Sequence, residues 1–177
     1  MRNIELFEEE LNLIKDVNLR LLTERMLLNV PEYFYSIAAS SSGKYHPQYA
    51  LGVGGLVRHT KAAIKIANSL LSLEQYSVEA TKMDIIIMAL LLHDSFKQGI
   101  IQSEYTVNEH PVLAASFVKH FDPHYKDVLK EVADLIKSHM GQWYDYKPQT
   151  DLQKFVHLCD YLASRKFLEV IFEEEED

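Results

Sequence analysis

The sequence is short of the residues that cross-link or interrupt a chain. Its single cysteine, Cys159, cannot form a disulfide within the chain, and we interpret it as a small buried helix residue rather than a catalytic thiol. Only six glycines and five prolines occur among 177 residues, and they fall in clusters. Long stretches of the chain can therefore form uninterrupted helix, and the length is sufficient for one domain with a sizeable core.

Long apolar runs and an excess of positive charge are also absent. The longest apolar run, 85–92, is far too short to span a bilayer, and glutamates at positions 5 and 8–10 interrupt any apolar stretch typical of a signal peptide. We therefore expect a cytoplasmic protein without a membrane partner. The net charge of −8 and the lack of a broad basic stripe disfavour long duplex nucleic acid as a partner. The acidic run 173–177 is predicted to be a solvated tail.

Apolar periodicity predicts an all-α fold, a single-domain helical bundle covering 1–177. Near the start, apolar residues recur every three or four positions from Ile4 to Leu21, which indicates an N-terminal helix within 1–30, and Pro31 could begin a second helix. Further helices are expected at 56–73, 78–94, 109–121, 123–140 and 151–172, with Ser77 and Thr81 as candidate caps of the second of these. Polar loops separate them at 40–47, 97–108 and 141–150.

Four histidines and two aspartates fall at helix ends or on faces predicted to be buried. A lone histidine on an apolar face is more often a hydrogen-bonded core residue than a metal ligand, and the same caution holds for a lone aspartate. The pair that follows the most apolar segment is more informative, because a buried carboxylate is costly unless a cation is bound to it. Together the six predict a metal site made of His59, His93, Asp94, His110, His139 and Asp160.

The order and local context of these residues resemble the HD superfamily of metal-dependent phosphohydrolases. Residues 54–60 (GGLVRHT) resemble the motif GGL-x-x-HT, and residues 91–97 (LLHDSFK) resemble LLHD-x-x-K. Residues 138–141 (SHMG) resemble the SHHG element, and 157–160 (HLCD) resemble the closing helix. The sequence is most similar to the HD domain of bacterial 3′–5′ exoribonucleases, over roughly 33–166. The resemblance implies an HD-type bundle and hydrolysis of a phosphate ester or anhydride.

The resemblance also implies a division of the ligands between two divalent transition-metal ions. Asp94 would bridge them, with His59, His93 and Asp160 on one ion and His110 and His139 on the other. Mixed imidazole and carboxylate ligation suits Mn, Fe, Zn or Ni, and six ligands exceed what one catalytic zinc normally takes from a protein. Such ions activate water and stabilise charge on phosphoryl oxygens.

Besides Asp94, Lys97 is a candidate catalytic residue that would orient Asp94 or neutralise phosphate charge; the alternative is a solvent-exposed lysine at a helix end. Candidate substrate contacts are Lys44 and His46 in the polar loop, with an ordinary flexible loop as the alternative. Trp143 could stack on a base or act as a structural lid residue, and Arg165 could contact phosphate or face water.

Several functions remain open at this level. The leading interpretation is hydrolysis of a small nucleotide-like substrate, which the acidic composition favours over the first alternative. That alternative is a 3′–5′ exonuclease acting on short single strands, which the motif similarity favours. A non-catalytic nucleotide-sensing module and a purely structural bundle are the others; six intact candidate ligands argue against both. Oligomeric state is not indicated.

Overall fold

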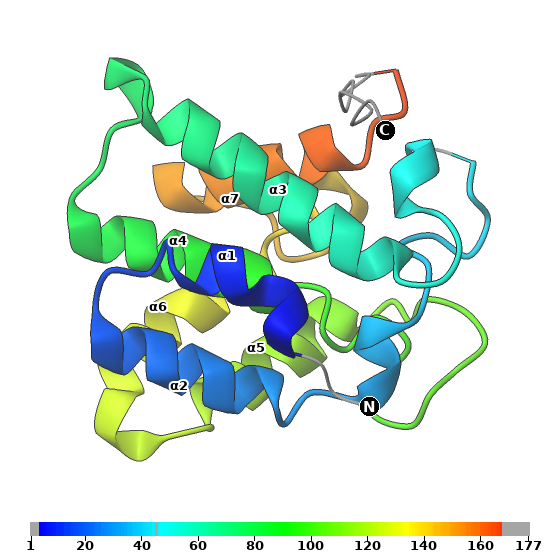
Figure 1. Ribbon diagram of the computed structural model, residues 1–177, viewed down its shortest axis with the longest axis horizontal. Helices are drawn as coiled ribbons and strands as arrows, with labels where there is room; N and C mark the ends of the chain where they lie inside the picture. Colours follow the sequence, from blue (N-terminus) through cyan, green and yellow to red (C-terminus); the bar gives the residue numbers. More distant parts are fainter. Residues whose placement is uncertain (1–3, 45, 168–177) are drawn as a thin grey trace, which may run out of the picture.

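Helix α4 (Ala80–Leu92) forms the centre of the bundle in the computed structural model, which describes residues 4–44 and 46–167 (Figure 1). From Asp84 to Leu92 every residue of this helix is buried. A helix that is apolar all round has no face to present to water, so other helices must enclose it.

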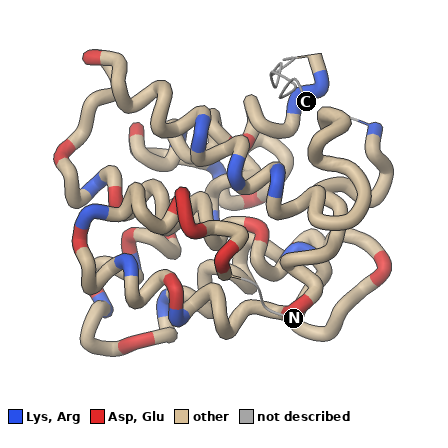
Figure 2. Tube along the Cα trace, in the orientation of Figure 1, with Lys and Arg blue, Asp and Glu red and all other residues tan. Residues whose placement is uncertain are grey.

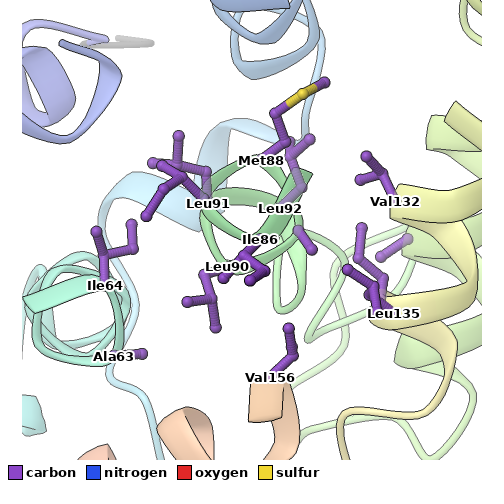
Figure 3. Packing of buried hydrophobic residues seen from close by; sticks show 14 of the residues in the cluster. Ala63, Ile64, Ile86, Met88, Leu90, Leu91, Leu92, Val132, Leu135 and Val156 are labelled. Atoms are coloured by element: carbon purple, nitrogen blue, oxygen red, sulfur yellow. The ribbon is translucent and has the colours of Figure 1, made fainter. Parts of the chain in front are cut away.

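Three helices supply most of that enclosure: α3 (Gly55–Leu71), α6 (Lys126–Lys137) and α7 (Asp151–Ala163). Their apolar faces meet α4 in a close-packed core, and α5 (His110–Lys119) packs on α6. Figure 3 shows side chains from these helices around α4: Ala63 and Ile64 from α3, Val132 and Leu135 from α6, and Val156 from α7.

The all-α prediction is confirmed, since the described residues form helices and no strand. Within the same residues, no helix combines the length and the apolar character needed to cross a membrane.

The predicted N-terminal helix is wrong in one respect, because the segment is broken into pieces: the 3-10 turn η1 (Ile4–Phe7), α1 (Glu8–Leu11) and α2 (Val17–Leu27). The buried carboxylate of Asp84 in α4 accepts hydrogen bonds from the backbone N–H groups of Lys15 (2.8 Å) and Asp16 (2.9 Å). Asp16 in turn caps α2 through the N–H groups of Asn18 and Leu19. The break persists because its backbone donors have partners.

Other predicted boundaries are corrected by local contacts. A single 3-10 turn, η2 (Glu32–Tyr35), follows Pro31, and η3 (Gln48–Ala50) precedes α3. Neither Ser77 nor Thr81 caps α4; Glu79 occupies that position, and the Ser77 hydroxyl closes the turn η4 (Glu74–Tyr76) by donating to the Glu74 carbonyl.

The last two predicted helices are shorter than expected. A 3-10 turn, η5 (Pro123–Tyr125), precedes α6, which ends at Lys137 rather than Met140, and η6 (Gly141–Trp143) follows. Helix α7 begins with a capping box formed by Thr150 and Gln153 and ends at Ala163. The predicted extension to residue 172 ends in residues outside the described ranges, as does the predicted acidic tail 173–177.

Candidate metal centre

The structure brings together all six residues that the sequence predicted as ligands. They come from five different places: the N-terminal part of α3, the turn that follows α4, the first residue of α5, the turn after α6, and α7. Five of the six are almost fully buried, and Asp160 is partly so. They are, in chain order, His59, His93, Asp94, His110, His139 and Asp160.

A glycine allows α3 to approach the preceding loop closely enough to place His59. A Cβ atom on Gly55 would lie 2.3 Å from the carbonyl oxygen of Ala50, a separation that side-chain carbons do not adopt. The backbone N–H of Leu56 meanwhile donates to the carbonyl of Ile37 (2.9 Å). The second glycine of the GGL motif is thus explained by the contact between α3 and the loop before it.

Asp94 lies at the middle of the cluster, with its two carboxylate oxygens facing different histidines. Oδ2 lies 3.5 Å from Nε2 of His93 and 3.9 Å from Nε2 of His59. Oδ1 lies 3.1 Å from Nε2 of His110 and 3.6 Å from Nε2 of His139. A carboxylate in this position can contribute one oxygen to each of two neighbouring sites.

The second carboxylate, Asp160, faces only one side of the cluster. Its Oδ1 lies 2.9 Å from Nε2 of His59 and 3.5 Å from Nε2 of His93. Two groups of three ligand atoms come close enough to share an ion: His59, His93 and Asp160 form one, and His93, Asp94 and His139 form the other.

Backbone carbonyls fix the orientation of three of the histidines. Nδ1 of His93, His110 and His139 lies 2.7 to 2.8 Å from the carbonyl oxygens of Leu90, Val107 and Ile136, respectively. A carbonyl oxygen can only accept, so each Nδ1 carries a proton, and a neutral ring then has its lone pair on Nε2. This is the arrangement by which surrounding groups orient imidazole for metal ligation.

The resulting lone pairs point at one another, which is unfavourable without a positive charge between them. Nε2 of His110 and Nε2 of His139 are only 3.3 Å apart. Among the described residues, the buried atoms His93 Nε2 and Asp94 Oδ1 have no hydrogen-bond partner. Buried polar atoms without partners are costly, so this set of ligand atoms fits a bound cation, and imidazole nitrogen with carboxylate oxygen fits a divalent transition metal.

The local electrostatics keep negative charge in the cluster. Burial alone would raise the pKa of Asp94, but Lys97, His93 and the other histidines hold it well below its usual range. Burial likewise opposes ionisation of Asp160, yet the hydrogen bond with His59 and the nearby His93 ring hold its pKa well below the usual range.

The pKa values of His93 and His139 shift in opposite directions. Burial disfavours the charged form of His93, but the carboxylates of Asp94 and Asp160 outweigh it and raise its pKa to about 10. Burial lowers the pKa of His139, against the opposing effect of Asp94. In the absence of a metal ion, the cluster therefore holds a proton on His93 at neutral pH.

Lys97 contacts the cluster directly. Its Nζ donates a hydrogen bond to Asp94 Oδ2, and the residue is only 9% exposed, so the alternative of a solvent-facing lysine is wrong. His46 also lies beside the cluster, and its ring centroid is 5.6 Å from the ring centroid of His59. Burial, followed by the influence of His59 and Lys97, lowers the pKa of His46 to about 4, so its ring is neutral at physiological pH.

The remaining predicted contact residues occupy two different surroundings. Lys44 is exposed on the loop before His46. Trp143 is 48% exposed and stacks on Tyr161, with ring centroids 5.7 Å apart and planes within 9°. The Arg165 guanidinium lies over both rings, 4.3 Å from the Tyr161 centroid and 5.2 Å from that of Trp143. We refer to Trp143, Tyr161 and Arg165 as the aromatic shelf.

Sequence reasoning missed two residues that hold this shelf to the cluster. Tyr161 directly follows Asp160 in α7, and His157 lies one turn before Tyr161. Nδ1 of His157 donates to the carbonyl of His139 (2.6 Å), and its ring contacts those of Trp143 and Tyr161. A Cβ atom on Gly141, whose φ is +58°, would lie 2.3 Å from the His157 ring. The i, i+4 spacing of His157, Tyr161 and Arg165 on a predicted helix was the available signal.

Comparison with known proteins agrees with this geometry. A family model described as HD domain matches residues 56–165, which is more than half of the chain, and the chain therefore belongs to the HD domain family. Members of this family are generally metal-dependent phosphohydrolases that bind divalent metals. Neither the curated proteins nor the solved structures contain a significant match to the chain.

Proposed function

We propose that the chain hydrolyses a phosphate ester or anhydride in a small nucleotide-like substrate, with two divalent transition-metal ions at the candidate centre. The observation that carries the proposal is the convergence of imidazole nitrogen and carboxylate oxygen atoms in one buried cluster, where two of them, among the described residues, lack a hydrogen-bond partner. The position of Asp94 between two pairs of histidines supports the use of two ions rather than one.

The roles of the cluster residues combine their contacts with the division of ligands that the family resemblance implies. His59, His93 and Asp160 would hold one ion, His110 and His139 the other, and Asp94 would contribute one oxygen to each. When bound, such ions lower the pKa of water and neutralise charge on phosphoryl oxygens. Lys97 would position Asp94 through their hydrogen bond and keep its carboxylate ionised. His46, neutral beside His59, could accept a hydrogen bond from substrate or water.

The aromatic shelf supports a substrate that carries both a ring and a phosphate. The exposed part of Trp143 offers an aromatic surface for a base, since stacking tolerates any base. Arg165 offers a planar cation beside it, held in place by the two rings and by the Ser164 hydroxyl. Both belong to the segments that carry His139 and Asp160, so a bound base would lie near the ions.

The test is hydrolysis of free nucleotides, measured beside a short labelled single strand, with Mn²⁺ or Fe²⁺ added. We expect the free nucleotides to be the better substrates. Faster cleavage of the strand from its 3′ end would favour the exonuclease alternative, which the motifs favour. Absence of bound metal and of any hydrolysis would overturn the proposal in favour of a sensing module.

A matched pair of variants tests whether a loss of activity comes from the metal centre or from the removal of a negative charge in general. Asp94→Asn removes one negative charge from the middle of the cluster, and we expect it to abolish turnover while circular dichroism shows the same helical content. Asp134→Asn removes the same charge on the exposed side of α6, where the side chain pairs with Lys130, and should leave turnover unchanged. Full activity of Asp94→Asn would contradict the assigned role.

A further inference from the structure

His157 is not one of the six candidate ligands, yet its ring contacts the turn that carries one of them. It lies partly buried in α7, three residues before Asp160. Its Nδ1 donates a hydrogen bond to the backbone carbonyl of His139 (2.6 Å), 18 positions earlier in the chain. Its Nε2 faces the side-chain amide of Gln142, 3.2 Å from Oε1. His157 therefore joins the helix of one ligand to residues 138–143, the turn that carries another.

The turn 138–143 is shaped around this ring. Gly141 has a φ of +58°, in the region that favours glycine, and a Cβ atom there would lie 2.3 Å from atoms of the His157 ring. Trp143 packs on the same ring, with centroids 6.1 Å apart. A side chain at position 141 would push the ring away from the carbonyl that it binds, so the glycine and the histidine form one contact.

Two hydrogen bonds of different reach fix the orientation of His139. The bond from its Nδ1 to the carbonyl of Ile136 (2.7 Å) lies within its own segment and moves with that segment. The bond from His157 ties the turn to another helix. Among the described residues, the polar contacts that join 138–143 to α7 are the two made by His157. The turn also contains no Lys, Arg, Asp or Glu, the residues coloured in Figure 2, that could tie it to α7 by an ion pair.

The position of His139 affects one candidate ion site and not the other. Its Nε2 lies 3.6 Å from Oδ1 of Asp94 and 3.3 Å from Nε2 of His110. Of the two groups of three ligand atoms described above, one includes His139, and the group that includes Asp160 does not. Ligands have to be held within about 0.5 Å of their productive positions. A displacement of the turn would therefore weaken one site selectively.

We propose that His157 is a positioning residue for the ion that His110 and His139 would hold. Its hydrogen bond to the His139 carbonyl keeps the turn 138–143 at a fixed distance from α7, and thereby from the site that includes Asp160. The inference rests on the two-ion centre of the proposed function. Groups that orient a ligand without contacting the metal typically contribute about 10–100-fold to metal affinity.

Mn²⁺ binding to the full chain, followed by calorimetry and by electron paramagnetic resonance, tests the proposal. Two Mn²⁺ ions bound side by side couple magnetically and give a spectrum that differs from the spectrum of isolated ions, and we expect this coupled spectrum for the wild-type chain. His157→Leu keeps an apolar side chain at this position but has no donor. We expect it to bind one ion as the wild type does and the other about 10–100-fold more weakly, with the spectrum of isolated ions.

Two further variants test the contact by other routes. Gly141→Ala pushes the ring away from the turn and should cause the same selective loss as His157→Leu. His157→Asn can place an amide N–H where Nδ1 stands, and it should restore the second ion and the coupled spectrum. The matched control is His120→Leu, since Nδ1 of His120 bonds to the carbonyl of Ser116 (2.9 Å) within α5 and its helix position lies about 15 Å along α5 from His110. This control should bind Mn²⁺ as the wild type does.

The outcomes separate this inference from the proposed function. Two coupled ions in both His157→Leu and Gly141→Ala would overturn the positioning role. Equal weakening of both ions, or failure of His157→Asn to restore the second, would overturn it in favour of a general contribution to folding. A wild-type chain that binds fewer than two ions would overturn the two-ion centre itself, and the inference with it.

Discussion

The break between α1 and α2 depends on one buried carboxylate, and its removal gives a quantitative test of the fold. Asp84 is 2% exposed and accepts hydrogen bonds from two consecutive backbone N–H groups, those of Lys15 and Asp16. Asp84→Ala removes both acceptors and leaves the two donors to partly exposed surroundings.

The expected magnitude follows from these two contacts. A hydrogen bond to a charged group contributes about 1.5–3 kcal/mol, and we take the lower end for each because Lys15 and Asp16 can reach water. The free energy of unfolding should therefore fall by about 3 kcal/mol. For a chain of this length, that loss corresponds to a decrease in Tm of roughly 6–12 °C.

Urea denaturation followed by circular dichroism, with chelator present throughout so that metal binding does not contribute, measures this loss. Asp84→Asn keeps one acceptor oxygen and should have an intermediate effect. Asp145→Ala, at an exposed loop position, should change the free energy of unfolding by no more than about 0.5 kcal/mol. A loss below about 1 kcal/mol for Asp84→Ala would show that the break is held by other contacts.

Two further predictions concern the site and the core. Burial opposes a charged His93, but Asp94 and Asp160 raise its pKa to about 10. Metal binding at pH 7–8 should therefore release about one proton, and the affinity for the metal should rise about tenfold for each unit of increasing pH. Calorimetry in buffers of different ionisation enthalpy measures the proton release. The control variant His120→Gln, at an exposed histidine, should release the same proton. A metal affinity that does not change with pH would refute the assignment of this proton to His93. Burial, aided by Asp160, raises the pKa of Cys159 to about 12, so a thiol reagent at pH 8 should react only after unfolding in guanidinium; rapid labelling of the native protein would contradict that burial.

Much of the site could be predicted from the sequence because its ligands have strong local signals. His93 and Asp94 follow a continuous apolar run that has to be a buried helix, and His59 follows a glycine pair that a close backbone contact requires. These relations involve neighbouring residues, and a family match over 56–165 agrees with them. The central position of α4 follows from the same apolar run.

The boundaries of the helices could be predicted less well, since a partner far along the chain decides some of them. Periodicity from Ile4 to Leu21 continues through the break at residues 12–16, and only the approach of Asp84, 69 positions away from Lys15, satisfies the freed backbone groups there. The same limit applies to Lys97, whose sequence position fits either solvent or the cluster. Its burial against Asp94 depends on the packing of the turn after α4.

The sequence by itself determined the residue types of the centre and the helices that carry them, because hydrophobic periodicity and short motifs act over a few positions. Only the tertiary structure decided how the side chains face one another: the two oxygens of Asp94 toward separate histidine pairs, the proton on Nδ1 of three of the histidines, and the shelf of Trp143, Tyr161 and Arg165. Those relations depend on distances between helices far apart in the chain, and such distances are fixed only when the core packs.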